Sequence, residues 1–168
     1  MSTSEKDRFI GIIRSHKGIL AKIIRSYCKN PDDWKDLEQE IVIQLWKSFK
    51  QYDERYKLST WIYRIALNVA ISHYRRDLKR KNDTPLEEAI FVLAEDPATQ
   101  EHQERLKNLY EFINQQNALD KGLLILYLEE NTHKEIADIM GVTESNVGTR
   151  LNRVKQKLKV YFDARNHE

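Results

Sequence analysis

Apolar residues recur along this chain at steps of three and four, the spacing of amphipathic α-helices. The first series runs from Phe9 to Tyr27 and predicts one long helix, which the break around Pro31 ends. A second series, from Trp34 to Phe49, predicts a helix capped by Asp32 or Asp33. The first 50 residues are therefore expected to form two helices.

A third apolar series follows a polar loop over residues 51–57. It predicts a helix that is capped by Ser59 or Thr60 and faces inward with Trp61, Ile62, Ile65, Ala66, Val69 and His73. Further helices are predicted over residues 84–94, 100–117 and 119–130. The helix over residues 84–94 is predicted because Thr84 can cap it and Pro85 suits its first position.

Residues 132–143 have the spacing of a helix-turn-helix. Thr132 and Glu135 form a capping box, so a helix begins near His133, and its buried side is expected to hold Ile136, Ala137 and Met140. Gly141 can adopt the left-handed conformation that the turn needs, and Thr143 caps the next helix. Ala137 is small enough for that helix to cross closely.

The second helix of this motif has an apolar stripe and a polar edge. The stripe consists of Val147, Leu151, Val154, Leu158 and Tyr161. The opposite edge carries Asn146, Thr149, Arg150, Arg153 and Lys157. Arg and Asn can read base edges in the major groove while Lys and Arg hold phosphates, so duplex DNA is the expected partner. The alternative is a solvated surface helix of a helical bundle.

Composition supports an all-α fold of two small helical domains joined by a linker, with the helix-turn-helix in the C-terminal domain. Gly and Pro are scarce (5 and 3 residues) among 168, and 40% of residues are hydrophobic. The expected division is 1–82, an acidic linker over 83–100, and 101–168. Residues 1–82 carry a net charge of +8 and residues 83–118 one of −6, which fits two nucleic-acid-binding modules around an acidic segment, although chance scatter of charge is the alternative.

The remaining composition excludes several classes of protein. Cys28 is the only cysteine, so no internal disulfide is expected and a reducing cytoplasm is the natural location. The longest apolar run, Leu123–Leu128, is too short to insert into a membrane. The five histidines show no metal-binding spacing, and no phosphate loop or activated nucleophile is present, so no metal, cofactor or catalytic residue is expected.

The third predicted helix has a polar stripe of its own. Arg64, Asn68, Ser72, Arg75, Arg76 and Lys79 lie near one another at helical spacing, and Trp61 and Tyr63 stand at its start. Aromatic rings beside cations suit single-stranded DNA, because bases stack on rings and the backbone needs positive charge. For Trp61 a core position is the alternative. The second predicted helix is acidic and apolar around Asp36 and Leu37, a surface that favours a protein partner over DNA.

Three segments together resemble bacterial sigma factors of the extracytoplasmic-function type. They are DLEQEIVIQLW (Asp36–Trp46), STWIYRIALNVAISHYRR (Ser59–Arg76) and HKEIADIMGVTESNVGTRLNRVKQKL (His133–Leu158). They occur in the family's order, and the resemblance extends over about residues 6–162. Gly148 stands where the family frequently has Lys on the recognition helix.

The resemblance implies a transcription initiation factor that binds core RNA polymerase. In the family's terms residues 1–82 would be sigma domain two and residues 101–168 sigma domain four. Domain two would dock on the clamp helices of the largest subunit through Asp36, Leu37, Gln39, Glu40 and Ile43. It would capture and melt the minus-ten element, partly as single-stranded DNA, through Trp61, Tyr63, Arg64, Asn68, Ser72, Arg75, Arg76 and Lys79. Domain four would contact the flap of the second-largest subunit and read the duplex minus-thirty-five element through Thr143, Glu144, Ser145, Asn146, Thr149, Arg150, Arg153 and Lys157. An anti-sigma factor is a further implied partner.

Two other functions are less consistent with the sequence. A free-standing helix-turn-helix regulator would explain the C-terminal motif but not the acidic second helix or the aromatic-flanked basic third helix. A metal-dependent nuclease would need ligand spacing that the histidines lack. The sequence therefore predicts a protein that acts by binding and not by catalysis.

Overall fold

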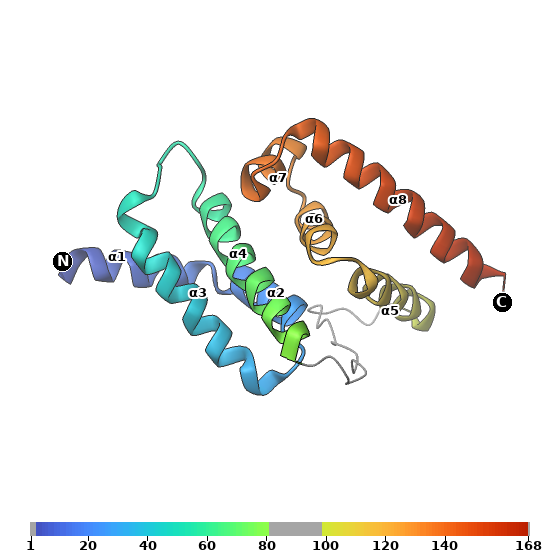
Figure 1. The fold of residues 1–168 in the computed structure, drawn as a ribbon, viewed down its shortest axis with the longest axis horizontal. Coiled ribbons are helices and arrows are strands. Elements are labelled where there is room, and N and C mark those ends of the chain that lie inside the picture. Colours follow the sequence, from blue (N-terminus) through green and yellow to red (C-terminus); the bar gives the residue numbers. More distant parts are fainter. Residues whose placement is uncertain (1–2, 81–98, 168) are drawn as a thin grey trace. The chain divides into compact units, whose positions relative to one another are not determined.

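The structure is a computed structural model that describes residues 3–80 and 99–167. Regular structure in these residues is entirely helical, which confirms the predicted all-α class. The helices fall into two compact units, α1–α4 and α5–α8 (Figure 1). The predicted linker helix over 84–94 lies outside the described residues.

The first predicted helix is two helices. α1 (Thr3–Ser15) and α2 (Lys17–Tyr27) are separated at His16, whose backbone has φ −116° and ψ 20°. The bend lets each helix pack on different partners. Phe9 of α1 lies 4.9 Å from the ring of Trp46, whereas α2 packs against α4 and the start of α3. The expectation of one continuous helix is wrong because the apolar spacing continues across the bend.

The rest of the first unit follows the predicted order with shifted helix starts. It consists of the 3-10 turn η1 (Pro31–Asp33), α3 (Trp34–Ser48), the 3-10 turn η2 (Phe49–Gln51) and α4 (Leu58–Arg80). Asn30 caps η1 by accepting a hydrogen bond from the Asp32 amide (3.1 Å), and Asp33 is the N-cap of α3 without a side-chain hydrogen bond. The predicted cap at Ser59 or Thr60 is wrong, because α4 begins at Leu58 and Thr60 is buried within it.

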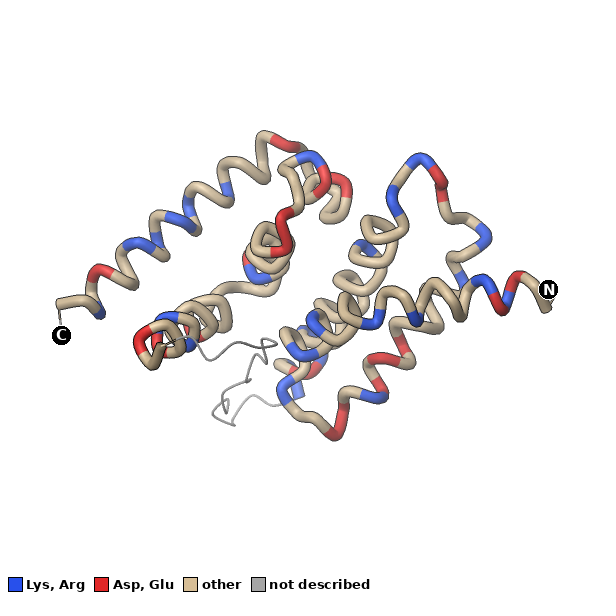
Figure 2. Tube along the Cα trace, turned by 180° about the vertical axis from the view of Figure 1, so that it is seen from behind, with Lys and Arg blue, Asp and Glu red and all other residues tan. Residues whose placement is uncertain are grey.

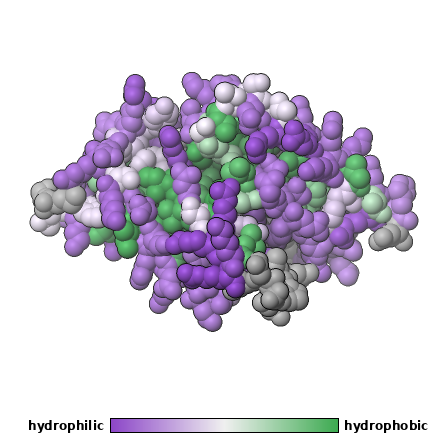
Figure 3. Space-filling view, viewed as in Figure 1, coloured by the Kyte–Doolittle hydropathy of each residue, from purple (hydrophilic) through white to green (hydrophobic). Residues whose placement is uncertain are grey.

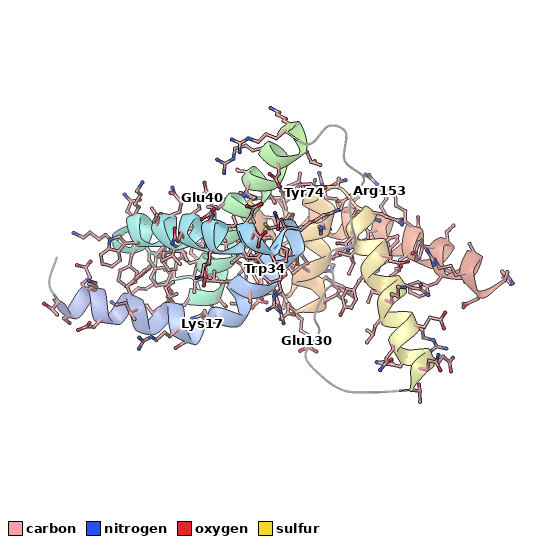
Figure 4. All side chains as sticks on the ribbon, turned by 90° about the horizontal axis from the view of Figure 1, so that it is seen from below. Lys17, Trp34, Glu40, Tyr74, Glu130 and Arg153 are labelled. Atoms are coloured by element: carbon pink, nitrogen blue, oxygen red, sulfur yellow. The ribbon has the colours of Figure 1, made fainter. Side chains whose placement is uncertain are left out.

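The core of the first unit lies among α2, α3 and α4. The buried face of α4 is centred on Ile62, Ala66 and Ala70, with Tyr63, Leu67 and Ile71 beside them. The predicted inward residues Trp61, Ile65, Val69 and His73 are only half-buried. Cys28 is 1% exposed, as expected for a small core residue, and its carbonyl accepts a hydrogen bond from the indole of Trp34 (2.9 Å; Figure 4 labels Trp34).

The second unit contains α5 (Gln100–Gln115), α6 (Ala118–Leu128), α7 (His133–Met140) and α8 (Glu144–Asn166). Part of its core is a cluster of Phe112, Ile113, Leu124 and Val154, against which the half-buried Leu109, Tyr110, Leu158 and Tyr161 pack. This arrangement holds α5, α6 and α8 around shared apolar side chains. It accounts for the predicted apolar stripe of α8.

The helix-turn-helix forms from the residues that predicted it. The Thr132 hydroxyl accepts from the Glu135 amide (3.1 Å), and the Glu135 carboxylate accepts from the Thr132 amide (2.9 Å). Gly141 ends α7 in the left-handed region, with φ 68° and ψ 36°, and Thr143 caps α8. One detail differs: Ile139 is buried, whereas Met140 is only half-buried.

Polar and charged side chains cover most of the surface seen in Figure 3, with apolar areas between them. None of the helices in the described part of the chain combines the length and the apolar character that crossing a membrane requires.

Candidate nucleic-acid interface

The outer edge of α4 carries the polar stripe that the sequence predicts. Arg64, Asn68, Ser72, Arg75, Arg76 and Lys79 are all exposed. Arg75, Arg76 and Lys79 lie toward the C-terminal end of α4. Positive charge at that end also complements the helix dipole, and Figure 2 shows the Lys and Arg positions along the trace. Amide, hydroxyl and guanidinium groups along one helix edge are suited to bases and phosphates.

A groove of about 470 Å³ lies between α3 and α4. Asn68 and Ser72 line it from α4, with Ile65 and Val69 as its apolar part, and Gln44 lines it from α3. Glu40 and Arg76 meet across it in an ion pair of 3.1 Å, and both side chains are about half exposed. The groove thus offers hydrogen-bonding groups and apolar surface side by side, with its one acidic side chain already paired to a cation.

Aromatic rings join the loop before α4 to the body of the first unit. The ring of Tyr52 lies 5.2 Å from that of Trp61, which lies 6.1 Å from Phe49. Trp61 is half-buried in this cluster, so it is both a packing residue and an accessible ring. Tyr63, in contrast, is 5% exposed and belongs to the core, so its predicted place on the DNA surface is not supported. Tyr63 precedes Arg64 in the sequence, but at about 100° per residue it lies on the buried face of α4 with Ile62 and Ala66.

Short-range contacts hold the loop itself. The Arg55 guanidinium donates to the Asp53 carboxylate at 2.7 Å, and the Arg55 amide donates to it at 3.0 Å. These hydrogen bonds lower the pKa of the Asp53 carboxyl. The Tyr52 hydroxyl donates to the Tyr56 carbonyl, and partial burial followed by the charge of Glu54 raises the pKa of Tyr52. The loop therefore has a defined conformation next to the aromatic cluster.

The outer face of α3 presents Asp36, Gln39, Glu40 and Ile43, on the side away from the core residues Ile41 and Leu45. Ile43 is 50% exposed and so adds apolar surface among the polar side chains of this face. Leu37, predicted for the same surface, is 0% exposed and packs inward, so it supports this face without being part of it. Figure 4 labels Glu40 on α3.

The outer edge of α8 presents the predicted residues of the recognition helix. Thr143, Glu144, Ser145, Asn146, Thr149, Arg153 and Lys157 are exposed. The Thr143 hydroxyl accepts from the Asn146 amide (3.0 Å), so this residue also starts the helix. Lys and Arg recur along α8 (Figure 2), and Figure 4 labels Arg153.

Arg150 differs from the other predicted readers. It is half-buried, and its Nη1 lies 3.3 Å from Oδ1 of Asp120 on α6. Sequence reasoning missed Asp120, although its position three residues after Asn117 marks the start of a helix. That spacing explains the local hydrogen bonds between Asn117 and Asp120, but it does not predict a contact with α8.

Two family models match the chain, one on each compact unit. The Sigma-70 region 2 model matches residues 12–80, and the model for Sigma-70, region 4 matches residues 108–158. Among similar proteins are two from Bacillus subtilis (strain 168). RNA polymerase sigma factor SigV is 27% identical over 157 residues, which cover 92% of this chain and 91% of SigV. ECF RNA polymerase sigma factor SigW is 23% identical over 178 residues, which cover 92% of this chain and 89% of SigW.

Two solved structures have the same fold at low sequence identity. The sigma factor RpoE in complex with the anti-sigma factor NepR, from Bartonella quintana, aligns with a TM-score of 0.69 and 16% identity, covering 96% of this chain and 98% of that one. CnrH in complex with the cytosolic domain of CnrY aligns with a TM-score of 0.66 and 18% identity, covering 95% and 90%.

Proposed function

Since the chain belongs to the sigma-70 family, as an RNA polymerase sigma factor of the extracytoplasmic-function type, we propose that the outer faces of α3, α4 and α8 divide polymerase docking and promoter recognition between them. The observation that carries this proposal is the match of region 2 and region 4 to separate helical units in the family's order. The protein acts by binding core RNA polymerase and promoter DNA. It contributes positioning and DNA capture, and no catalytic group of its own.

The outer face of α3 docks on core polymerase, at the clamp helices of the largest subunit. An exposed isoleucine beside Asp36, Gln39 and Glu40 supports this role, because interfaces combine an apolar contact with a polar rim. An acidic face also disfavours DNA, whose phosphates would be repelled. Ile43 is the apolar centre of the proposed contact, and Leu37 fixes the helix from inside.

The outer edge of α4, the groove beside it and the loop over residues 52–57 capture the melted minus-ten element. Asn68 and Ser72 offer hydrogen bonds to unstacked bases, and Arg64, Arg75 and Lys79 hold the backbone. The half-buried Trp61 offers the edge of a ring at the start of this surface. Capturing bases that have left the duplex supplies free energy that offsets the cost of unstacking them.

The outer edge of α8 reads the minus-thirty-five element as duplex DNA, and the same unit contacts the flap of the second-largest subunit. Ser145, Asn146 and Thr149 lie near the start of α8, the part of a recognition helix that contacts base edges. Arg153 continues this edge and can grip a guanine or a phosphate. Lys157 lies further along, where phosphates are the expected contacts.

The expected location is the cytoplasm, where core polymerase and the chromosome are. An anti-sigma protein is the expected regulator, and the two solved structures support this, since RpoE was determined with the anti-sigma factor NepR and CnrH with a domain of CnrY. Affinity capture of the tagged chain from its native cells, followed by identification of bound proteins, tests for such a partner.

The decisive experiment reconstitutes the purified chain with core RNA polymerase from its own source. A library of genomic promoter fragments is transcribed with and without the chain, and transcript starts are sequenced. Starts that appear only with the chain and share two conserved elements support the proposal. Tight, specific binding to duplex DNA without polymerase, with no new starts, would instead indicate a free-standing regulator.

A further inference from the structure

Two cations of α8 are held by α6 and not presented on the outer edge. Nη1 of Arg150 lies 3.3 Å from Oδ1 of Asp120, near the start of α6. Nζ of Lys155 lies 4.4 Å from the centre of the Tyr127 ring, near the end of α6. On α8, Arg150 and Lys155 lie on opposite flanks of the core stripe formed by Val147, Leu151 and Val154. The recognition helix is therefore fastened to α6 on both sides.

The Asp120 carboxylate is built into the unit. Asp120 is 7% exposed, its Oδ2 accepts from the Asn117 amide group (2.9 Å), and its backbone amide donates to Asn117 (2.9 Å). A carboxylate so well buried needs a partner for its charge, because an unpaired buried charge is strongly disfavoured. Arg150 is the only cation that forms an ion pair with Asp120 in the described part of the chain.

The position of Arg150 on α8 agrees with this role. At about 100° per residue, Arg150 lies roughly 60° from Val147 at the centre of the core stripe and Lys157 roughly 80°, whereas Thr149 and Arg153 point away from the core. Arg150 therefore lies between the core stripe and the outer edge, and its contact with Asp120 distinguishes it from the exposed Lys157. The Arg150 guanidinium is paired with the Asp120 carboxylate. A DNA phosphate would compete with that carboxylate for the N–H donors of the guanidinium. Engagement by Asp120 thus removes one cation from the set available to DNA.

We propose that Asp120 is a positioning residue for promoter recognition: it holds Arg150 against α6, so that Arg150 fixes the recognition helix and does not contact DNA. Resting on the function proposed above, this assigns the reading of the upstream element to Asn146, Thr149 and Arg153, and phosphate contact to Lys157. The number of phosphates that α8 neutralises is then set by an acidic residue on a neighbouring helix.

The test measures how DNA affinity depends on salt, since each phosphate neutralised adds about 0.9 to the slope of log affinity against log salt. Holoenzyme is assembled from core polymerase and the full chain, wild type or variant. The probe is a duplex fragment that wild-type holoenzyme selects from a random-sequence pool. The variants are Arg150→Gln, Asp120→Asn, the two combined, and Lys157→Ala, each checked for helix content by circular dichroism.

Arg150→Gln is expected to keep the wild-type slope because no phosphate contact is lost, while its affinity falls because the recognition helix loses the contact with Asp120 that fixes it. Asp120→Asn frees Arg150 for a phosphate, so its slope becomes steeper by about 0.9, and adding Arg150→Gln returns it to the wild-type slope. Lys157→Ala, the matched control, makes the slope shallower by about 0.9. A merely structural ion pair would not give the steeper slope that depends on Arg150.

A slope shallower by about 0.9 for Arg150→Gln overturns the proposal, because Arg150 would then contact a phosphate in the wild type. The salt slope of Arg150→Gln tests the proposal even if Asp120→Asn fails to fold. Failure of the proposed function looks different: wild-type holoenzyme itself would select no sequence from the pool.

Discussion

Gly141 allows a stability prediction whose size follows from its geometry. The residue has φ 68° and ψ 36°, and a Cβ added there would meet no atom within 4 Å. Gly141→Ala therefore introduces no clash, and its whole cost is that of a left-handed backbone, about 1–2 kcal/mol. This is a factor of roughly 5–30 in the folding equilibrium of the second unit.

Gly148→Ala is the matched control, with the opposite expected sign. Gly148 lies inside α8, and the nearest atom to an added Cβ is Nδ1 of His133 at 3.9 Å, an ordinary contact distance. Replacing glycine by alanine within a helix stabilises it by about 0.8–1.0 kcal/mol. The same chemical change thus lowers stability at one position and raises it at another seven residues away.

Urea unfolding of the full chain measures both effects. Far-UV circular dichroism follows all helices, while tryptophan fluorescence follows only the first unit, because Trp34, Trp46 and Trp61 all lie there. The circular dichroism midpoint of the second unit is expected to fall for Gly141→Ala and to rise for Gly148→Ala, with the fluorescence transition unchanged. Equal stability of Gly141→Ala and wild type, or losses of equal size for both variants, would refute the argument from backbone conformation.

Three further predictions concern the proposed surfaces. Ile43→Asp should weaken association with core polymerase at least tenfold, measured by competition for core enzyme, while Glu38→Gln on the flank of α3 should not; equal effects would contradict a centre at Ile43. Asn68→Ala should slow open-complex formation on a duplex promoter and be partly rescued by a pre-melted template; a normal opening rate would remove Asn68 from the proposed site. Arg153→Ala should cost about 1–3 kcal/mol and relax preference at one base position, whereas Lys157→Ala should weaken all sequences alike; uniform loss in both would make Arg153 a phosphate contact.

Local signals in the sequence predicted the second unit well. A capping box, a glycine and a second cap lie within 12 residues, and each corresponds to one feature of the backbone. The bend at His16 has no such signal. It contains neither Gly nor Pro, and the apolar spacing continues through it, so periodicity alone could not separate α1 from α2.

The limits of prediction at the site have a related cause. Tyr63 and Leu37 are next to polar residues in the sequence but lie on the buried faces of their helices, Tyr63 with Ile62 and Ala66, and Leu37 with Ile41 and Leu45. For α4 the apolar spacing predicts an inward face that includes Trp61, Ile65 and Val69, which are only half-buried, and so it does not place Tyr63 in the core. The pairing of Arg150 with Asp120 joins residues 30 apart in the chain, and only the packing of α8 on α6 brings them together.

Because both units consist of helices joined by tight connections, most of their contacts are local in sequence, and such folds form in microseconds to milliseconds. Synthesis on the ribosome is far slower, at about 5–20 residues per second, so the remaining half of the chain takes roughly 4–18 s to complete after α4 has been made. The first unit therefore has time to fold, with its α3 and α4 surfaces formed, before α8 exists. A nascent chain can in this way meet a partner of its first unit seconds before its second unit is finished.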